Sequence, residues 1–450
     1  MHRFFAILIS LWLIATWPTV SLSQGRGIAL IRDAEIENTI RTYAAPIFEA
    51  AGLENAAISI YLVNDRSLNA FVAGGQNIFV HTGLLLAAEN PQQVIGVLAH
   101  ETGHITGGHL ARSSDAFRSA TAVSMISILA GVAAMAAGAA DAGAALLGSS
   151  GGFAQRAFFK YSRTQESSAD QAALTFLNAS EQSATGLIEF FERLISEEIK
   201  ITTNRDPYIR SHPLTRQRIT RLFDGATRSP YWDKPASPEL IDRHHRMRAK
   251  LRGFLLDPQD TFNIYPRTDR SLYARYARAV AFHKAAEMEL ALATTDSLLD
   301  EKPKDPYFHE LKGQILFESG KVTEAIEPYR NAVKYAPGET LLRVSFAQAI
   351  IASEDPSLNE EAIRHLKVAN QRDPYNPFAW HQLAIAYSRD GRQELADLAT
   401  AERYLLTGRF RDSIGLAERA ATQISEDSPD WWRAQDVVNL ATQLMEKQGR

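Results

Sequence analysis

Residues 90–104 of the chain read NPQQVIGVLAHETGH, and this stretch predicts a helix with a well-defined start. Asn90 is a residue type that caps helices, because its side chain can accept a hydrogen bond from a free backbone N–H. Pro91 suits the first helical position, and Gln93 supplies the polar residue of a capping box. The side chains of the following turns, up to residue 104, are therefore expected to project from a regular helix.

The end of this helix carries two histidines at a spacing that suits metal binding. His100 and His104 are four residues apart and project from one helix face about one turn apart, so both imidazoles can reach a single ion. Glu101, one residue around the helix, can address a water on that ion. This H-E-x-x-H pattern is typical of zinc-dependent hydrolysis, in which a carboxylate acts as base beside the metal.

A catalytic site of this kind needs a third protein ligand and an open position for water. Glu166 is the best carboxylate candidate, with Asp170 on the same helix face as a second partner for a histidine. A solvated acidic face is the alternative interpretation of this pair. We expect His109 to be structural, because at helical spacing it points away from the ligand face, and we expect the same of His81 at the end of a strand.

Composition excludes several classes of protein. The chain has 450 residues, 45% of them hydrophobic and 22% charged, which is typical of folded material in about three domains. A formal charge of −4 gives no drive toward nucleic acid, and we predict no nucleic-acid partner. There is no cysteine, so the sequence offers no disulfide framework, and any zinc must be bound by histidines and carboxylates.

Residues 1–23 have the pattern of a secretory signal peptide. A basic residue at Arg3 precedes an apolar run over residues 6–20, and small residues follow at Ser21 and Ser23. We predict export to a periplasm with removal of this segment. An uncleaved membrane anchor is the alternative, although the apolar run is shorter than the ~20 residues of a typical span.

The period of the hydrophobic residues predicts a mainly α chain with a small antiparallel β-sheet. Helical spacing runs over residues 28–53 and 156–177, and alternation runs over 57–82 with a Gly74-Gly75 turn. Residues 119–155 predict an apolar helical hairpin. This hairpin could be a lid or buried pair, could contact a membrane surface, or could span the membrane.

The later part of the chain is repetitive. Residues 226–269 are rich in proline around one basic helix and predict a linker, which separates residues 24–225 from residues 270–450. In the last segment Pro303, Pro337 and Pro374 recur at spacings of 34 and 37, close to the ~34-residue period of tetratricopeptide repeats. We therefore predict an α-solenoid of paired helices there.

Three motifs together resemble the M48 family of zinc metalloproteases: HETGH at 100–104, ESSAD at 166–170 and SHPLTRQRI at 211–219. The signal sequence and the repeat tail are similar to those of a periplasmic subgroup. The resemblance implies a zincin-like metalloprotease domain over residues 24–225 with one Zn²⁺ per chain. It implies the following roles: His100, His104 and Glu166 as metal ligands, Glu101 as catalytic base and Asp170 as a supporting acid.

The resemblance also implies roles for the third motif. His212 matches a histidine near the metal, where it could act as an extra ligand or assist the reaction, and Arg218 matches the basic residue that follows it. A helix-capping polar residue is the alternative interpretation of His212.

The function that we expect is peptide hydrolysis in envelope quality control. Substrate could lie as an added strand along Asn69-Ala70-Phe71, held by main-chain hydrogen bonds. The repeats would dock unfolded or misassembled outer-membrane proteins or the outer-membrane assembly machinery, and residues 119–155 could contact the membrane surface.

Two alternatives belong to other classes. The first is a tetratricopeptide adaptor or chaperone whose metal site is latent and self-blocked. The second is a membrane-embedded protease that acts on membrane substrates.

Overall fold

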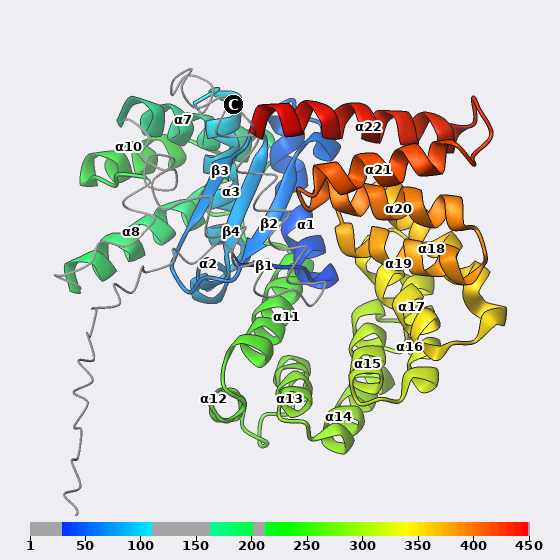
Figure 1. Ribbon diagram of the computed structural model, residues 1–450. Helices are drawn as coiled ribbons and strands as arrows, with labels where there is room; N and C mark the ends of the chain where they lie inside the picture. The colour runs from blue at the N-terminus through cyan, green and yellow to red at the C-terminus, as the bar shows by residue number, and fades with distance from the viewer. Residues whose placement is uncertain (1–28, 110–162, 201–211, 449–450) are drawn as a thin grey trace, which may run out of the picture.

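The structure is a computed structural model that describes residues 29–109, 163–200 and 212–448. The predicted signal peptide at 1–23 and the predicted apolar hairpin at 119–155 lie outside the described residues. Within the described ranges, no helix combines the length and the hydrophobicity that a membrane crossing requires. The described chain is mainly helical, as predicted, and it folds into an N-terminal part that contains the sheet and a tail of helix pairs (Figure 1).

The sheet is mixed rather than antiparallel, so that part of the prediction was wrong. The strand order is β1-β2-β4-β3; β1 and β3 run antiparallel to their neighbours, but β2 and β4 are parallel, from Ser59 opposite Asn77 to Val63 opposite His81. The β3–β4 hairpin turns at Gly74 and Gly75, both with positive φ, and it places β4 between β2 and β3. The strands are β1 (Leu30–Ile31), β2 (Ser59–Val63), β3 (Ala70–Ala73) and β4 (Asn77–His81).

Helix α3 (Pro91–Thr106) is the centre of the N-terminal part. The Asn90 side chain accepts a hydrogen bond from the Gln93 N–H at 3.1 Å, so the predicted cap is confirmed. Gly96 and Gly103 let two helices approach closely, because an added Cβ would lie 2.8 Å from the Leu187 backbone and 2.7 Å from the Ala169 carbonyl oxygen. The helices around α3 are α1 (Ala34–Ala50), α2 (Thr82–Ala87), α7 (Arg163–Ala179), α8 (Thr185–Lys200) and α10 (Arg216–Ala226), with a short 3₁₀ turn η1 (Asn55–Ala57).

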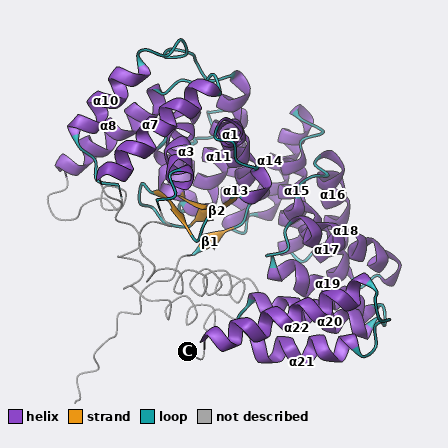
Figure 2. Cartoon of the chain, turned by 90° about the horizontal axis from the view of Figure 1, so that it is seen from above, coloured by secondary structure: helices purple, strands orange, loops and turns teal. Residues whose placement is uncertain are grey.

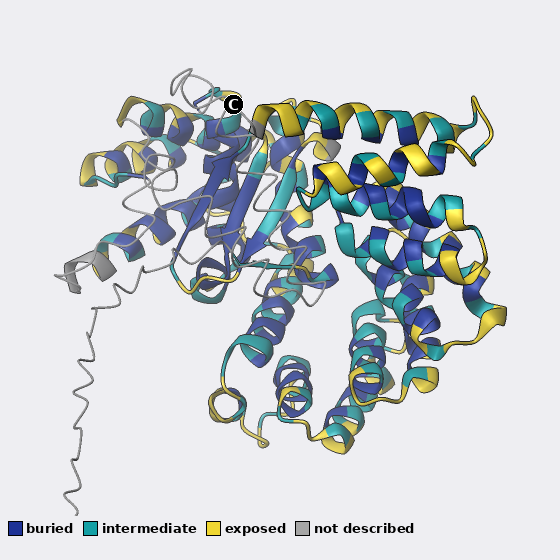
Figure 3. Ribbon diagram, viewed as in Figure 1, coloured by how far each residue is buried: buried dark blue, intermediate teal, exposed yellow. Residues whose placement is uncertain are grey.

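A continuous hydrophobic core joins the sheet to these helices. Tyr43 of α1 and Phe190 and Phe191 of α8 are among its largest fully buried side chains. Strands β3 and β4 and helix α3 are buried along most of their length, whereas β1 and most of β2 are half-buried (Figure 3). The histidines of α3 therefore lie in the interior of the protein and not on its surface.

The C-terminal tail consists of stacked helix pairs, which confirms the predicted repeats. Pro303, Pro337 and Pro374 lie in the turns between α14 and α15, α16 and α17, and α18 and α19. The helices are α11 (Pro238–Leu255), α12 (Pro258–Ile264), α13 (Leu272–Lys284), α14 (Met288–Glu301), α15 (Pro306–Glu318), α16 (Val322–Tyr335), α17 (Thr340–Ser353), η3 (Pro356–Leu358), α18 (Asn359–Arg372), α19 (Pro377–Arg389), α20 (Gln393–Leu406), α21 (Phe410–Ala421) and α22 (Pro429–Gln448).

The repeats curve back and contact the N-terminal part near the start of the described chain (Figures 1 and 2). Arg32 pairs with Asp373 at 2.8 Å, and Arg41 of α1 pairs with Glu339 at 2.9 Å. Helix α11 contributes a third ion pair, between Lys250 and Asp33 at 2.8 Å. Ion pairs that join distant segments at three places fix the repeats against the edge of the sheet where β1 lies.

Candidate metal centre

Four buried side chains converge in the N-terminal part. His100 and His104 come from consecutive turns of α3, Glu166 comes from α7, and His212 lies just before α10; one ligand atom from each lies within 4.8 Å of all the others. The two α3 imidazoles approach with Nε2 atoms 3.2 Å apart, and His212 Nδ1 lies 3.4 Å from His100 Nε2 and 3.2 Å from Glu166 Oε1. Lone-pair donors that face one point in this way fit a divalent metal.

The electrostatics of this cluster favour positive charge at its centre. Burial alone would lower the pKa of His100, but hydrogen bonds with Asp170 and Glu166 outweigh burial and raise this pKa to about 9. Burial would raise the pKa of Glu166, yet the surrounding histidines hold it well below the usual range, so Glu166 stays anionic. An anionic carboxylate among imidazoles supports a cation, and the donor set therefore fits a metal ion in charge as well as in geometry.

Glu101 lies beside the four side chains and is fully buried. Neither of its carboxylate oxygens has a hydrogen-bond partner among the described residues, and Oε1 lies 3.5 Å from His212 Nε2. Burial raises the pKa of Glu101 to about 6. A carboxylate in these surroundings can accept a proton and release it again near neutral pH.

Asp170 and Arg218 form a support behind the cluster. Asp170 Oδ1 lies 3.0 Å from His100 Nδ1, on the side of the ring away from the other donors. Arg218 of α10 donates from Nε and Nη2 to the two Asp170 oxygens, each at 2.7 Å, and its Nη1 lies 2.7 Å from Glu166 Oε2. Because Arg218 binds both carboxylates of α7 and is 5% exposed, it holds other residues in position and does not reach toward solvent.

His109 lies against the cluster, and the expectation that it points away from the ligand face was wrong. Its Nδ1 is 2.9 Å from His104 Nδ1, so each α3 histidine has a polar partner on its second ring nitrogen. Helix α3 ends at Thr106, and Gly108 has φ of +59°, so the chain reverses before His109 and helical spacing no longer applies. Gly107 provides the space for the His109 ring, because a Cβ at this position would lie 2.4 Å from the ring. The Gly-Gly pair after the helix was the signal that could have predicted this turn.

The remaining predicted residues lie apart from the four-residue cluster. His81 ends β4, its Nδ1 lies 2.8 Å from the Ser67 hydroxyl, and burial lowers its pKa to about 4, as suits a neutral structural histidine. Asn69 precedes β3, which begins with Ala70 and Phe71 and is the last strand in the sheet order. This strand packs against α3. Asn69 and the side chains of β3 are buried.

The site has two histidines on one helix, a carboxylate from a second helix and a buried glutamate next to the first histidine, and this arrangement is typical of metalloproteases. Residues 31–225 match the profile of the family described as "Peptidase family M48". Together with the relatives described next, this match indicates that the chain is a metalloendopeptidase.

Several known proteins are similar to the chain, some over nearly its whole length and one over a shorter stretch. The "Beta-barrel assembly-enhancing protease" of Yersinia pestis is 24% identical over 427 residues, which cover 93% of this chain and 86% of that protein. The protein of the same name from Escherichia coli (strain K12) is 25% identical over 434 residues, with 94% and 87% covered. "Metalloprotease YcaL" of Escherichia coli (strain K12) is 31% identical over 166 residues, with 37% of this chain and 60% of that protein covered.

Proposed function

We propose that the chain is a zinc-dependent endopeptidase that is exported to the periplasm and acts on outer-membrane proteins during their assembly. The observation that carries the proposal is the convergence of His100, His104 and Glu166 on one point with Glu101 beside them. The similarity over more than nine-tenths of the chain to proteins named beta-barrel assembly-enhancing protease supports the substrate class. The pattern of residues 1–23 supports export.

His100, His104 and Glu166 would hold the zinc ion, which when bound would supply Lewis acidity toward the scissile carbonyl and the attacking water. The chain supplies the proton transfers. Glu101 takes the proton of the water and passes it to the leaving amine. Asp170 Oδ1, 3.0 Å from His100 Nδ1, would keep Nε2 of that ring turned toward the other ligands.

Substrate access is the second element of the proposal. We propose that an extended substrate segment adds as a strand beside Asn69-Ala70-Phe71, where β3 ends the sheet order and packs on α3. Main-chain hydrogen bonds along a strand tolerate many side chains. The repeats would then supply selectivity, by docking misassembled barrel proteins or the assembly machinery.

A second candidate function rests on the position of His212. Its two ring nitrogens lie 3.2 Å from Glu166 Oε1 and 3.5 Å from Glu101 Oε1, between the ligand cluster and the base. A side chain there occupies the space that water and substrate need. This position supports an adaptor or chaperone whose metal site is blocked by its own histidine until a partner displaces it.

A Glu101→Gln variant tests the enzymatic proposal. We expect zinc-dependent cleavage of an unfolded outer-membrane β-barrel protein to fall by about 10²–10⁴-fold, because the base is lost while the ligands remain. Zinc content should be unchanged. Glu192→Gln, on the exposed face of α8, is the matched control and should cleave like wild type. Unchanged cleavage by Glu101→Gln would falsify the proposal.

A His212→Ala variant separates the two candidates. If the histidine blocks the site, cleavage should be faster in this variant than in wild type at equal zinc content. If cleavage is slower, His212 assists the reaction, and the adaptor with a self-blocked site loses its support. Complementation of barrel assembly by Glu101→Gln at the wild-type level would favour the adaptor.

A further inference from the structure

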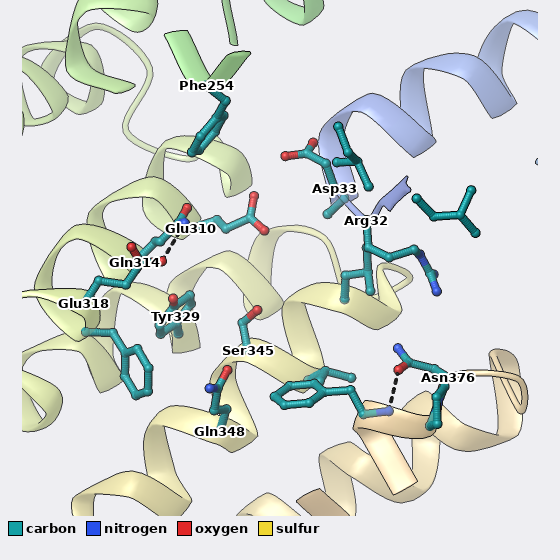
Figure 4. Close-up of a pocket in the computed structure, with 18 of the residues that line it drawn as sticks. Arg32, Asp33, Phe254, Glu310, Gln314, Glu318, Tyr329, Ser345, Gln348 and Asn376 are labelled. Carbon is teal, nitrogen blue, oxygen red and sulfur yellow. Dashed lines mark hydrogen bonds between the residues drawn. The ribbon is translucent and has the colours of Figure 1, made fainter. Parts of the chain in front are cut away.

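A cavity of about 430 Å³ lies where β1 meets the repeats, away from the metal centre (Figure 4). Residues of β1 and the start of α1 line one side, and residues of α15, α16, α17 and α19 line the other. Arg32 and Asp373, 2.8 Å apart, connect the two sides. The volume is within the range of pockets that bind ligands.

The β1 side of the cavity offers the backbone of a sheet edge. β1 is the first strand in the order β1-β2-β4-β3, and Leu30 and Ile31 both line the cavity. The Ala29 carbonyl accepts a hydrogen bond from the Asn64 N–H at 2.7 Å, so Ala29 turns its peptide groups toward the rest of the sheet. In an antiparallel pair alternate residues do this, and Leu30 therefore turns its N–H and C=O to the outer edge. A sheet edge of this kind can accept an added strand.

The repeat side offers aromatic surface with polar groups between. Tyr329 and Phe317 contribute rings to the lining. The Ser345 hydroxyl and the Gln348 amide of α17 extend into the cavity, and neither has a hydrogen-bond partner among the described residues (Figure 4). Aromatic walls with interspersed polar groups suit a ligand that carries apolar side chains on a hydrogen-bonding backbone.

The charge of the lining is negative. Asp33, Glu310 and Glu318 line the cavity, whereas Arg32 is its one basic residue and is already paired with Glu37 and Asp373. Lys250 lies 2.8 Å from Asp33 and 3.4 Å from Glu310, whereas Glu318 has the His283 imidazole and the Gln314 amide as its side-chain partners among the described residues. A basic group in the cavity would therefore be attracted chiefly to Glu318, which has no Lys or Arg partner there.

We propose that this cavity binds an extended segment of an unfolded polypeptide that carries an aromatic and a basic side chain. The segment would add to the outer edge of β1, place its aromatic side chain on the repeat side near Tyr329, and direct its basic group to Glu318. The inference rests on the proposed function in one respect, that unfolded polypeptides are what the protein meets. It assigns a docking site that is separate from the strand β3 and from the metal centre.

Fluorescence anisotropy with labelled peptides tests the inference, using the full mature chain with Glu101→Gln so that no probe is cleaved. The first probe is an unstructured peptide of about ten residues, ~33 Å when extended, with one phenylalanine and two lysines. The second probe replaces both lysines by glutamate. We expect saturable binding of the lysine probe and clearly weaker binding of the glutamate probe.

Two variants locate the binding. Ser345→Trp fills the cavity and should weaken binding of the lysine probe by about tenfold or more, which corresponds to about 1.4 kcal/mol or more of binding free energy. Ser388→Trp, exposed at the far end of α19 and outside the lining, is the matched control and should bind like wild type. Circular dichroism checks that both variants fold.

Charge reversal provides a test that does not depend on filling the cavity. Glu318→Lys, at a side chain that is 52% exposed, should weaken the lysine probe about threefold to tenfold at low salt, and Glu324→Lys on the exposed face of α16 should not. Equal binding by wild type, Ser345→Trp and Glu318→Lys would overturn the inference, as would the absence of saturable binding. Both results are independent of the cleavage assay. If the wild-type chain binds the probe but cleaves no protein, only the proposed function is overturned.

Discussion

The protein buries two charged clusters that differ in what neutralises them. The metal centre brings together His100, His104, Glu166 and His212 inside the N-terminal part. The second cluster, here called the junction cluster, consists of Asp33, Glu35, Arg246, Lys250 and Glu310 and joins the N-terminal part to α11 and the repeats. Both clusters are taken almost entirely out of water, where charge is costly unless it is compensated.

The junction cluster contains its own cations. Lys250 Nζ lies 2.8 Å from Asp33 Oδ2, 3.4 Å from Glu310 Oε2 and 3.6 Å from Glu35 Oε2, and it therefore occupies the place that a metal would take among three carboxylates. Arg246 adds a hydrogen bond from Nε to Glu35 Oε1 at 2.7 Å. A cluster that is closed by the chain's own ammonium group can hold two parts of a protein together, and it leaves no place for a metal ion among its carboxylates.

In the metal centre the ligand atoms of the histidines and of Glu166 face one another, and the cation, Arg218, lies on the outer side of the two carboxylates. Arg218 binds the outer side of Asp170 and Glu166, so the histidine nitrogens and Glu166 Oε1 remain directed at one another. Burial and composition alone therefore do not distinguish a catalytic cluster from a structural one. The position of the protein's own cation distinguishes the two clusters.

The largest expected effect comes from removing a ligand of the metal centre. Glu166→Gln should lower zinc content and reduce cleavage by about 10³-fold or more, since the Lewis acid contributes several kcal/mol to the transition state. Mass spectrometry of the native protein and the cleavage rate measure the two effects. Glu181→Gln, a 63% exposed carboxylate just beyond α7, is the control. Full zinc content in Glu166→Gln would remove this residue from the ligand set.

The next effect comes from removing the cation of the junction cluster. Lys250→Met leaves Asp33, Glu35 and Glu310 with less compensation, and the free energy of unfolding should fall by about 3–5 kcal/mol. Denaturant unfolding measures this loss. Zinc content should stay at the wild-type level, in contrast to Glu166→Gln. Lys302→Met, at a 39% exposed side chain, is the control, and an equal small effect of both variants would contradict the structural role of the cluster.

A smaller effect is expected from the second partner of His104. His109→Phe removes the group that faces His104 Nδ1 at 2.9 Å, and zinc affinity should fall about 10–100-fold as ring orientation is lost. Competition with a chromogenic chelator measures this affinity without reference to activity. His109→Asn, which keeps a hydrogen-bond acceptor, should recover part of the loss, and His309→Phe, at a half-buried histidine of α15 in the repeats, should not change the zinc affinity. Wild-type affinity in His109→Phe would assign His109 to packing alone.

The smallest effect is a pH dependence at the junction cluster. The pKa of Glu310 is raised from 4.5 to about 7 by burial, so its contribution to stability is fully present below pH 4.5 and is lost as the pH rises through 7. Lys250 stays charged over this range because the surrounding acids raise its pKa, and Tyr276 stays neutral because burial raises its pKa. Relative to wild type, Glu310→Gln should therefore gain stability as the pH rises from 4.5 to 8. Thermal unfolding at both pH values measures the difference, and a gain that is the same at both would contradict the assignment.

Local sequence features predicted the elements that short-range forces decide. The cap at Asn90, the helix through His104 and the proline-spaced helix pairs all depend on contacts within a few residues, and the structure has them where they were predicted. The same local reasoning failed at His109, because a Gly-Gly pair ended the helix, and in the sheet, because strand order depends on contacts between segments that are far apart in the sequence.

The sequence by itself determined that His100 and His104 would share a helix face with Glu101 beside them, since helix geometry alone sets that spacing. Only the tertiary structure decided that His212, 112 positions away from His100, and Glu166 would meet them in the interior. It also decided that Lys250 would close one buried cluster while the other kept its donors directed inward. The physical reason is that helix periodicity is fixed by local hydrogen bonds, whereas the placement of buried charge is fixed by how whole elements pack and which charges they bring together.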